Sequence, residues 1–351
     1  MAVFADDLGQ LFRSADHAKE IYKYEILSPI VNKLTCLLAI YFSTPFLTSV
    51  ESALRLYALS SLLGASLSLL ALKSCIPDFN THYLKYHSTK LLKEGFPFSI
   101  TTLFVMVSFY IDSVILGLHS LEENGIYNAA FRIIIVFGFL SSGVSHVLFA
   151  KFSRKSKNDA MQINQSLHYV VPIVLTVFTS LAIGTAALSN SAVALIYKEQ
   201  YAEAANLLFL LSPFIIFSSL SNIFAHTLEA CGLQKKVMKF NASTCLFNLI
   251  TNLIFIPFGG MYAAAITTIF TEAANTFLSY RELKKQGLTI KAKSLLPNIY
   301  ILFVMSITGF FAYQLSLFTG ALLGAAVFVP LLILHFKYLK TQNQEFASCV
   351  S

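Results

Sequence analysis

Apolar stretches of about 20 residues recur along the whole chain, and they limit what it can fold into. In a bilayer only helices and closed barrels satisfy every backbone hydrogen bond, and a helix needs about 20 apolar residues to cross. Of the 351 residues 56% are hydrophobic and 12% are charged, whereas a soluble domain carries about 25% charged residues. We therefore predict an all-α polytopic membrane protein.

Ten apolar windows are candidate membrane spans, at residues 29–49, 53–72, 96–118, 125–149, 168–188, 204–227, 238–257, 260–280, 296–316 and 319–338. Between the fifth and sixth windows, SAVALIYKEQY indicates a half-span or an interfacial segment. Pro172, Pro213 and Pro330 lie inside predicted spans, where proline kinks a helix. Bent helices suit a transporter that alternates between two open states.

Positive charge alternates from one predicted loop to the next. All but three of the 25 Lys and Arg residues lie in the two terminal segments or in every second loop; the exceptions are Arg55, Arg132 and Lys198. Cytoplasmic loops are enriched in Lys and Arg, so we predict that both termini are cytoplasmic. Because the basic residues are confined to short loops, the net charge of +7 does not indicate nucleic-acid binding.

The short connections also leave no room for a soluble catalytic domain, which argues against a membrane glycosyltransferase or polymerase. We predict a protein that is not an enzyme. The five cysteines lie singly and form no CxxC pair, so neither a disulfide framework nor a zinc site is indicated. No metal and no cofactor are predicted.

Polar residues repeat at helical spacing in five predicted spans. These stripes are Thr101, Ser108 and Asp112; Asn128, Arg132, Ser142 and His146; Ser218, Asn222, His226 and Glu229; Asn241, Thr244, Asn248 and Asn252; and Thr268, Glu272, Asn275 and Ser279. A polar stripe either packs helices together or faces a wet cavity. Since four of the five hold charge or His, we predict a shared polar cavity, with residues 296–316 and 319–338 at its periphery.

Asp112 and Arg132 lie on neighbouring antiparallel spans, each about 9–10 Å from the predicted outer end at ~1.5 Å per residue. They can form a structural ion pair, or a pair that opens to receive an anionic group on Arg132 or a proton on Asp112. Glu272 has no obvious cationic partner at its depth, so it is either protonated or faces the cavity. Proton coupling is one role that Glu272 could have in either case.

The segment KEGFPFSITTLFVMVSFYIDSVILGLHSLEENGIYNAAFRI resembles the start of the C-terminal lobe of Wzx-type polysaccharide flippases. In that family an Asp near the end of a span precedes a turn that Gly125-Ile126-Tyr127-Asn128-Ala129-Ala130 match here. NLITNLIFIPFGGMYAAAITTIFTEA is similar to a hairpin of the family, at Asn252, Pro257, Gly260, Ala264, Ala265, Thr268 and Glu272; Ala263 stands where the family usually has Gly. YKEQYAEAANLLFLLSPFIIF and LFRSADHAKEIYKYEIL are similar to an entry into a span and to a cytoplasmic linker.

The resemblance implies the two-lobe, MATE-like architecture of the multidrug/oligosaccharidyl-lipid/polysaccharide exporter superfamily, with six helices per lobe. On this basis residues 1–95 are the remnant of an N-terminal lobe, residues 96–285 are the C-terminal six-helix lobe, and residues 286–351 are two peripheral spans and a cytoplasmic tail. About four N-terminal helices of the family are expected to be absent from this chain.

The function that the resemblance implies is the flipping of a polyprenyl diphosphate-linked oligosaccharide, such as an O-antigen, capsule or exopolysaccharide repeat unit, across the bacterial inner membrane. The predicted cavity residues are Asp112, Asn128, Arg132, Asn248, Asn252, Glu272 and Asn275; those for gating or ion coupling are Asp112, His146 and Glu272. Expected partners are the bilayer, the lipid-linked substrate and a polysaccharide polymerase or other assembly proteins. Two alternatives stay open: a cation-coupled exporter of small amphipathic drugs, and a membrane protein that transports nothing.

Overall fold

The computed structural model describes residues 81–153, 160–197, 199–290, 300–309 and 317–350. All of the regular structure in these residues is helical, as predicted. The chain divides into two compact units, Met1–Thr89 and Lys90–Ser351. The predicted spans 29–49 and 53–72 lie outside the described residues, and the predicted three-part division of the chain stays a prediction.

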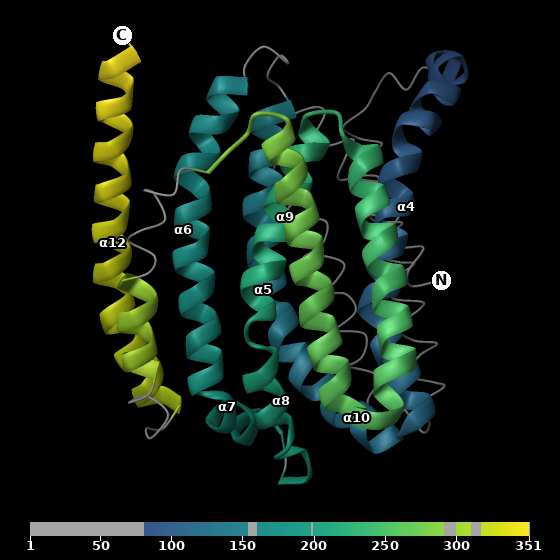
Figure 1. Cartoon of the computed structure of the whole chain (residues 1–351), viewed down its shortest axis with the longest axis vertical. Coiled ribbons are helices and arrows are strands. Elements are labelled where there is room, and N and C mark those ends of the chain that lie inside the picture. Colours follow the sequence, from purple (N-terminus) through teal and green to yellow (C-terminus); the bar gives the residue numbers. More distant parts are fainter. Residues whose placement is uncertain (1–80, 154–159, 198, 291–299, 310–316, 351) are drawn as a thin grey trace. The chain divides into compact units, whose positions relative to one another are not determined.

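Figure 1 shows the long helices of the second unit standing side by side, with short helices at one end. The elements are α4 (Thr81–His119), α5 (Leu121–Ser153), α6 (Ala160–Ala187), α7 (Ser189–Ile196), η3 (Glu199–Tyr201), α8 (Ala204–Leu211), α9 (Phe214–Ala230), α10 (Gln234–Lys285) and α12 (Leu317–Val350). A further apolar helix covers Tyr300–Gly309. The segment predicted to be interfacial holds the short helix α7 and the single turn η3.

Within the described residues, four helical stretches are long and apolar enough to cross a membrane: Gly95–His119, Leu121–Phe149, Met161–Ala187 and Gln234–Lys285. A fifth candidate is the pair Glu199–Leu211 and Phe214–Ala230, which bends by 50° at its break. Pro213 lies in that break, as the sequence predicts. By contrast, α6 and α12 continue through Pro172 and Pro330.

The 52-residue helix α10 is a hairpin that holds two predicted spans, 238–257 and 260–280. Its backbone leaves the helical region at Gly260, where φ is 52° and ψ is −137°. Figure 1 shows α10 reversing direction there, with its two halves side by side. An ion pair between Lys236 and Glu282 joins the two far ends of the hairpin. We call that end, where α5 and α9 also terminate, the basic end of the unit.

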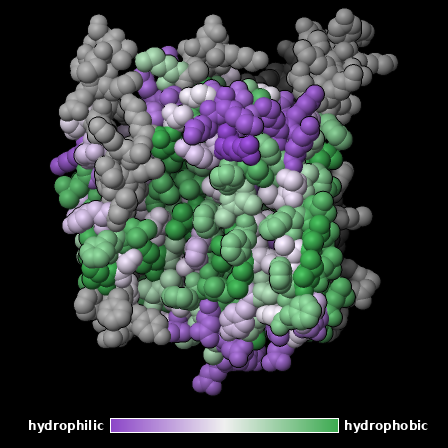
Figure 2. Space-filling model, viewed as in Figure 1, coloured by the Kyte–Doolittle hydropathy of each residue, from purple (hydrophilic) through white to green (hydrophobic). Residues whose placement is uncertain are grey.

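The hairpin is polar inside and apolar outside, which is the reverse of a soluble helix. In its first half Asn241, Thr244, Asn248 and Asn252 are buried, whereas Leu246, Phe247, Ile250, Leu253 and Ile254 are exposed. Figure 2 shows hydrophobic residues over the middle of the visible face and hydrophilic residues gathered toward its two ends. This arrangement fits a hydrocarbon solvent, because a bilayer solvates apolar side chains and leaves polar ones to find partners within the protein.

The last helix, α12, packs against α6, as expected for a peripheral span (Figure 1). A polar contact joins the two helices: Nδ1 of His335 lies 2.7 Å from the Thr176 hydroxyl. His335 is only 2% exposed, although it belongs to an otherwise apolar stretch of α12. A buried imidazole therefore fixes the register of α12 on α6.

Candidate functional site

Asp112 lies at the centre of a buried cluster of hydrogen bonds, with only 1% of its surface exposed. The Tyr127 hydroxyl of α5 donates to its carboxylate at 3.0 Å. The Asn252 amide and the Thr268 hydroxyl, from the two halves of α10, also donate to it. One carboxylate thus joins α4, α5 and both halves of the α10 hairpin. We call Asp112, Tyr127, Asn248, Asn252 and Thr268 the Asp112 cluster.

A second layer of polar residues surrounds this carboxylate. Asn248 is a further hydrogen-bond partner of Asp112, and its amide also donates to the Thr271 hydroxyl at 3.3 Å. Thr267 donates to the side-chain oxygen of Asn252. The side-chain oxygen of Asn248 is buried and accepts no hydrogen bond. The cluster therefore holds one carboxylate and one spare carbonyl acceptor in a site closed to solvent.

Local sequence explains why these groups meet. Helices α4 and α5 are separated by Ser120 alone, so Asp112 and Tyr127 face each other across a tight antiparallel turn. Asn128 reinforces the turn: its oxygen accepts from Ser113 of α4 at 3.0 Å, and its nitrogen donates to the backbone of Asn124 at 2.9 Å. The reversal at Gly260 then places Asn252 and Thr268 on facing halves of α10.

The chemistry of the cluster suits a hard monovalent cation better than a transition metal. Its groups are carboxylate, hydroxyl and amide oxygens, which are the ligands of hard cations. In the described part of the chain, no three His, Cys, Asp or Glu residues are grouped so that they could hold a metal ion. Asp112 is the only acid in the cluster as defined, so a single positive charge neutralises it.

The predicted ion pair between Asp112 and Arg132 does not form. Asp112 is enclosed by the donors named above, and Arg132 lies on an exposed stripe of α5 together with Val136 and Leu140. The two residues do have similar depth along neighbouring helices. However, Arg132 is five positions after Tyr127, which turns its side chain to a different face of α5. Two side chains at the same depth do not meet when they lie on faces of their helices that point in different directions.

Glu272 and Asn275 belong to a second polar group, nearer the basic end. The Glu272 carboxylate has the Ser221 hydroxyl of α9 as its hydrogen-bond partner. The Asn275 amide nitrogen donates to Ser221 at 3.1 Å and to the side-chain oxygen of Asn241 at 3.3 Å. We call Ser221, Asn241, Glu272 and Asn275 the Glu272 cluster.

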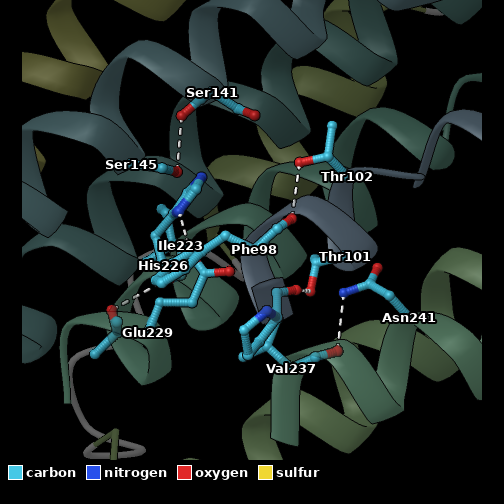
Figure 3. Close-up of polar contacts among 12 residues, drawn as sticks. Phe98, Thr101, Thr102, Ser141, Ser145, Ile223, His226, Glu229, Val237 and Asn241 are labelled. Atoms are coloured by element: carbon cyan, nitrogen blue, oxygen red, sulfur yellow. Dashed lines mark hydrogen bonds and ion pairs between the residues drawn. The ribbon is translucent and has the colours of Figure 1, made fainter. Parts of the chain in front are cut away.

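His146 lies far along α5 from the Asp112 cluster. It is 19 positions after Tyr127 on α5, or roughly 28 Å along the helix. Its ring lies 5.0 Å from the ring of His226, centroid to centroid. His226 in turn contacts the buried Glu229 carboxylate at 2.8 Å, and Figure 3 shows this pair one helical turn apart on α9. The structure therefore does not place His146 with Asp112.

The sequence did not single out three residues that the structure ties to these sites. Tyr127 is part of a motif, and Thr268 is part of a motif and of a polar stripe; neither is a predicted site residue, yet both bind the Asp112 carboxylate. Glu123 accepts a hydrogen bond from the backbone N–H of Met261 at 2.8 Å, at the first residue after the break in α10. Periodicity within one helix does not reveal partners that come from another helix.

Residues 9–155 match the model of a family described as "Polysaccharide biosynthesis protein". The chain is 25% identical over 172 residues to the "Probable low-salt glycan biosynthesis flippase Agl15" of Haloferax volcanii, a match that covers 48% of this chain and 36% of that protein. It is 24% identical over 274 residues to an uncharacterized membrane protein of Methanocaldococcus jannaschii, covering 74% of this chain and 52% of that one. The chain thus spans about a third to a half of these relatives.

Among solved structures, the fold is similar to that of "Lipid II flippase MurJ, inward closed conformation", with a TM-score of 0.73 and 17% identity. The match covers 96% of this chain and 73% of that one. At such low identity the likeness concerns the fold alone. The fold and the family comparisons together confirm the resemblance that the sequence predicts: this is a multi-pass membrane protein that is similar to flippases of polysaccharide biosynthesis.

Proposed function

We propose that the protein takes part in flipping a polyprenyl diphosphate-linked oligosaccharide across the cytoplasmic membrane of a bacterium, and that a cation bound at Asp112 drives the change between its two states. The mechanism is a movement of helices with no catalytic step. The observation that carries the proposal is the Asp112 cluster, in which one buried carboxylate joins four helical segments of a flippase-like fold.

A buried carboxylate in a membrane is costly unless it is neutralised, and such residues mark ion pathways in transporters. With a cation bound, the Asp112 cluster holds α4, α5 and the α10 hairpin in one arrangement. When the cation leaves, the uncompensated charge favours an arrangement in which Asp112 reaches water. Because a ligand shifts a conformational equilibrium only by binding the two states differently, ion binding at this position can be coupled to helix movement.

Arg132 is the proposed contact for the diphosphate or for an acidic sugar. Its guanidinium is exposed on α5 and forms no ion pair with the residues that the structure describes. Arginine is always charged and binds phosphate through two hydrogen bonds at once. The lipid tail would remain in the bilayer. A polysaccharide polymerase or another assembly protein would receive the flipped product.

The test is a flipping assay with the full chain in proteoliposomes. The probe is a polyprenyl diphosphate bearing a short oligosaccharide with a fluorophore on the sugar, and an impermeant reductant outside destroys only exposed fluorophores. We expect the protein to carry labelled lipid from the inner to the outer leaflet, where the reductant destroys its fluorescence. Arg132→Gln should slow this exposure by about tenfold, the equivalent of roughly 1.4 kcal/mol. Arg281→Gln, an exposed arginine at the end of α10, is the matched control and should flip normally.

Two results would overturn the proposal. One is an inner pool that stays protected in the presence of correctly inserted protein. The other is an Arg132→Gln variant that flips as fast as the Arg281→Gln control. Transport of a small amphipathic cation by proteoliposomes that leave the lipid-linked sugar in place would instead favour a drug exporter.

A further inference from the structure

The Glu272 cluster contains a carboxyl group that has no cationic partner among the described residues. Glu272 lies within the second half of α10, one helical turn beyond Thr268, and its partner is a neutral serine hydroxyl. None of the three ion pairs between described residues involves Glu272. Acids inside a membrane bundle are otherwise paired, protonated or on an ion path.

Most hydrogen-bond donors of the cluster already have acceptors. Both hydrogens of the Asn275 amide are used, on Ser221 and on Asn241. The Ser221 hydroxyl is used on Glu272, and Asn241 donates to the backbone carbonyl of Val237 at 3.1 Å, as Figure 3 shows. Few N–H and O–H groups of the cluster are therefore free to donate a further hydrogen bond.

Acceptors, by contrast, are left over. The side-chain oxygen of Asn275 is buried and accepts no hydrogen bond, and Asn275 itself is 8% exposed. The oxygens of Ser221 and Asn241 each accept one bond and keep a second lone pair. The buried Asn275 oxygen without a partner calls for an explanation such as an ion. A proton on Glu272 supplies one donor only, whereas an alkali cation binds the carboxylate and several of these oxygens together.

We propose that Glu272, Ser221, Asn275 and Asn241 form a second site for a monovalent alkali cation, separate from the Asp112 cluster and nearer the basic end of the unit. Three helical segments supply the ligands: α9 and both halves of α10. The two sites lie in series along the hairpin, with Thr268 and Glu272 one turn apart. The inference deepens the ion coupling proposed above, but it does not depend on which substrate is flipped.

Equilibrium binding of radioactive Na⁺ to the purified full chain, in a choline background, tests this site without transport. We expect the unaltered chain to bind two Na⁺ ions and Glu272→Gln to bind one. Asp112→Asn should also bind one ion, and the double variant should bind none. Ser219→Ala is the matched control, because Ser219 is buried two positions from Ser221 but donates to its own helix, to the Ile216 carbonyl at 2.8 Å.

A second variant keeps the test informative if Glu272→Gln folds poorly. Asn275→Ala removes the side-chain amide, including its unpartnered oxygen, but keeps the Glu272 carboxylate. It should weaken Na⁺ binding at the second site by roughly tenfold, as loss of a supporting ligand does in metal sites. The inference is overturned if the unaltered chain binds no Na⁺, or if it binds a single Na⁺ that Asp112→Asn removes. It is also overturned if Glu272→Gln and Asn275→Ala both bind as much Na⁺ as the Ser219→Ala control. Since no flipping is measured, failure here and failure in the flipping assay are separate results.

Discussion

At the scale of single residues, the environment of Asp112 shows how a bilayer changes the role of a carboxylate. Its oxygens accept hydrogen bonds from a phenol, an amide and a hydroxyl, so the side chain organises its neighbours. Two of these donors have a second contact: Thr268 also donates to the Ala264 carbonyl at 2.8 Å, and the Tyr127 hydroxyl lies 3.2 Å from the Thr268 hydroxyl. Removing the carboxylate therefore takes the acceptor chiefly from the Asn252 amide, and a buried donor left without a partner costs about 1–3 kcal/mol.

Substitution at Asp112 should separate the loss of charge from the loss of hydrogen bonding. Asp112→Ala should be destabilising by about 1–3 kcal/mol or more, and Asp112→Asn by less. The amide keeps the volume, and the Tyr127 and Thr268 hydroxyls can turn to accept from it. Thermal unfolding of the purified variants in one detergent measures the difference. Equal stability of the two variants would show that these hydrogen bonds contribute little.

At the scale of the elements, the α10 hairpin organises the unit. Polar contacts join its halves at three levels, Asn252 to Thr267, Asn248 to Thr271 and Asn241 to Asn275. The reversal between the halves has its own cap. The Glu123 carboxylate accepts from the first N–H after the break, where a helix N-terminus carries partial positive charge. The first turn of α5, which holds Glu123, thereby fixes the turn of α10.

Gly260 should be the most sensitive glycine of this hairpin. Its positive φ suits glycine, and a Cβ there would overlap the Glu123 carboxylate. We expect Gly260→Ala to lower the free energy of unfolding by about 1–3 kcal/mol, the cost of such backbone strain, and by more where Glu123 is displaced. Gly143→Ala in α5 is the control, because a Cβ there meets nothing within 4 Å. Thermal unfolding of both variants checks this, and an undisturbed Gly260→Ala would contradict the cap.

At the scale of the whole molecule, orientation in the membrane rests on charge. Both ends of α10 and the C-terminal ends of α5 and α9 meet at the basic end, while α7, α8 and the break at Gly260 lie at the opposite end (Figure 1). The predicted cytoplasmic loops that connect the described helices leave from the basic end, so the topology of these helices is consistent with the alternation of Lys and Arg. From the positive-inside rule we predict that the basic end is cytoplasmic.

Labelling of single cysteines tests that orientation. In a variant without the five native cysteines, Glu203→Cys at the start of α8 should react with an impermeant maleimide on intact cells. Gln286→Cys, just after α10, should react only after permeabilisation. Both positions are exposed, so access depends on the side of the membrane. The opposite pattern would mean that the protein inserts with its basic end outward.

The sequence alone determined the helical membrane fold, the reversal near Gly260 and the bend at Pro213, because these depend on local hydropathy and on the backbone limits of Gly and Pro. It also determined which helices carry buried polar groups. Only the tertiary structure decided how those groups combine: Asp112 pairs with Tyr127 and Thr268 and not with Arg132, and Glu272 joins Ser221 and Asn275. The physical reason is that helical periodicity gives the face and depth of a side chain on its own helix, whereas its partners depend on how neighbouring helices are rotated and packed.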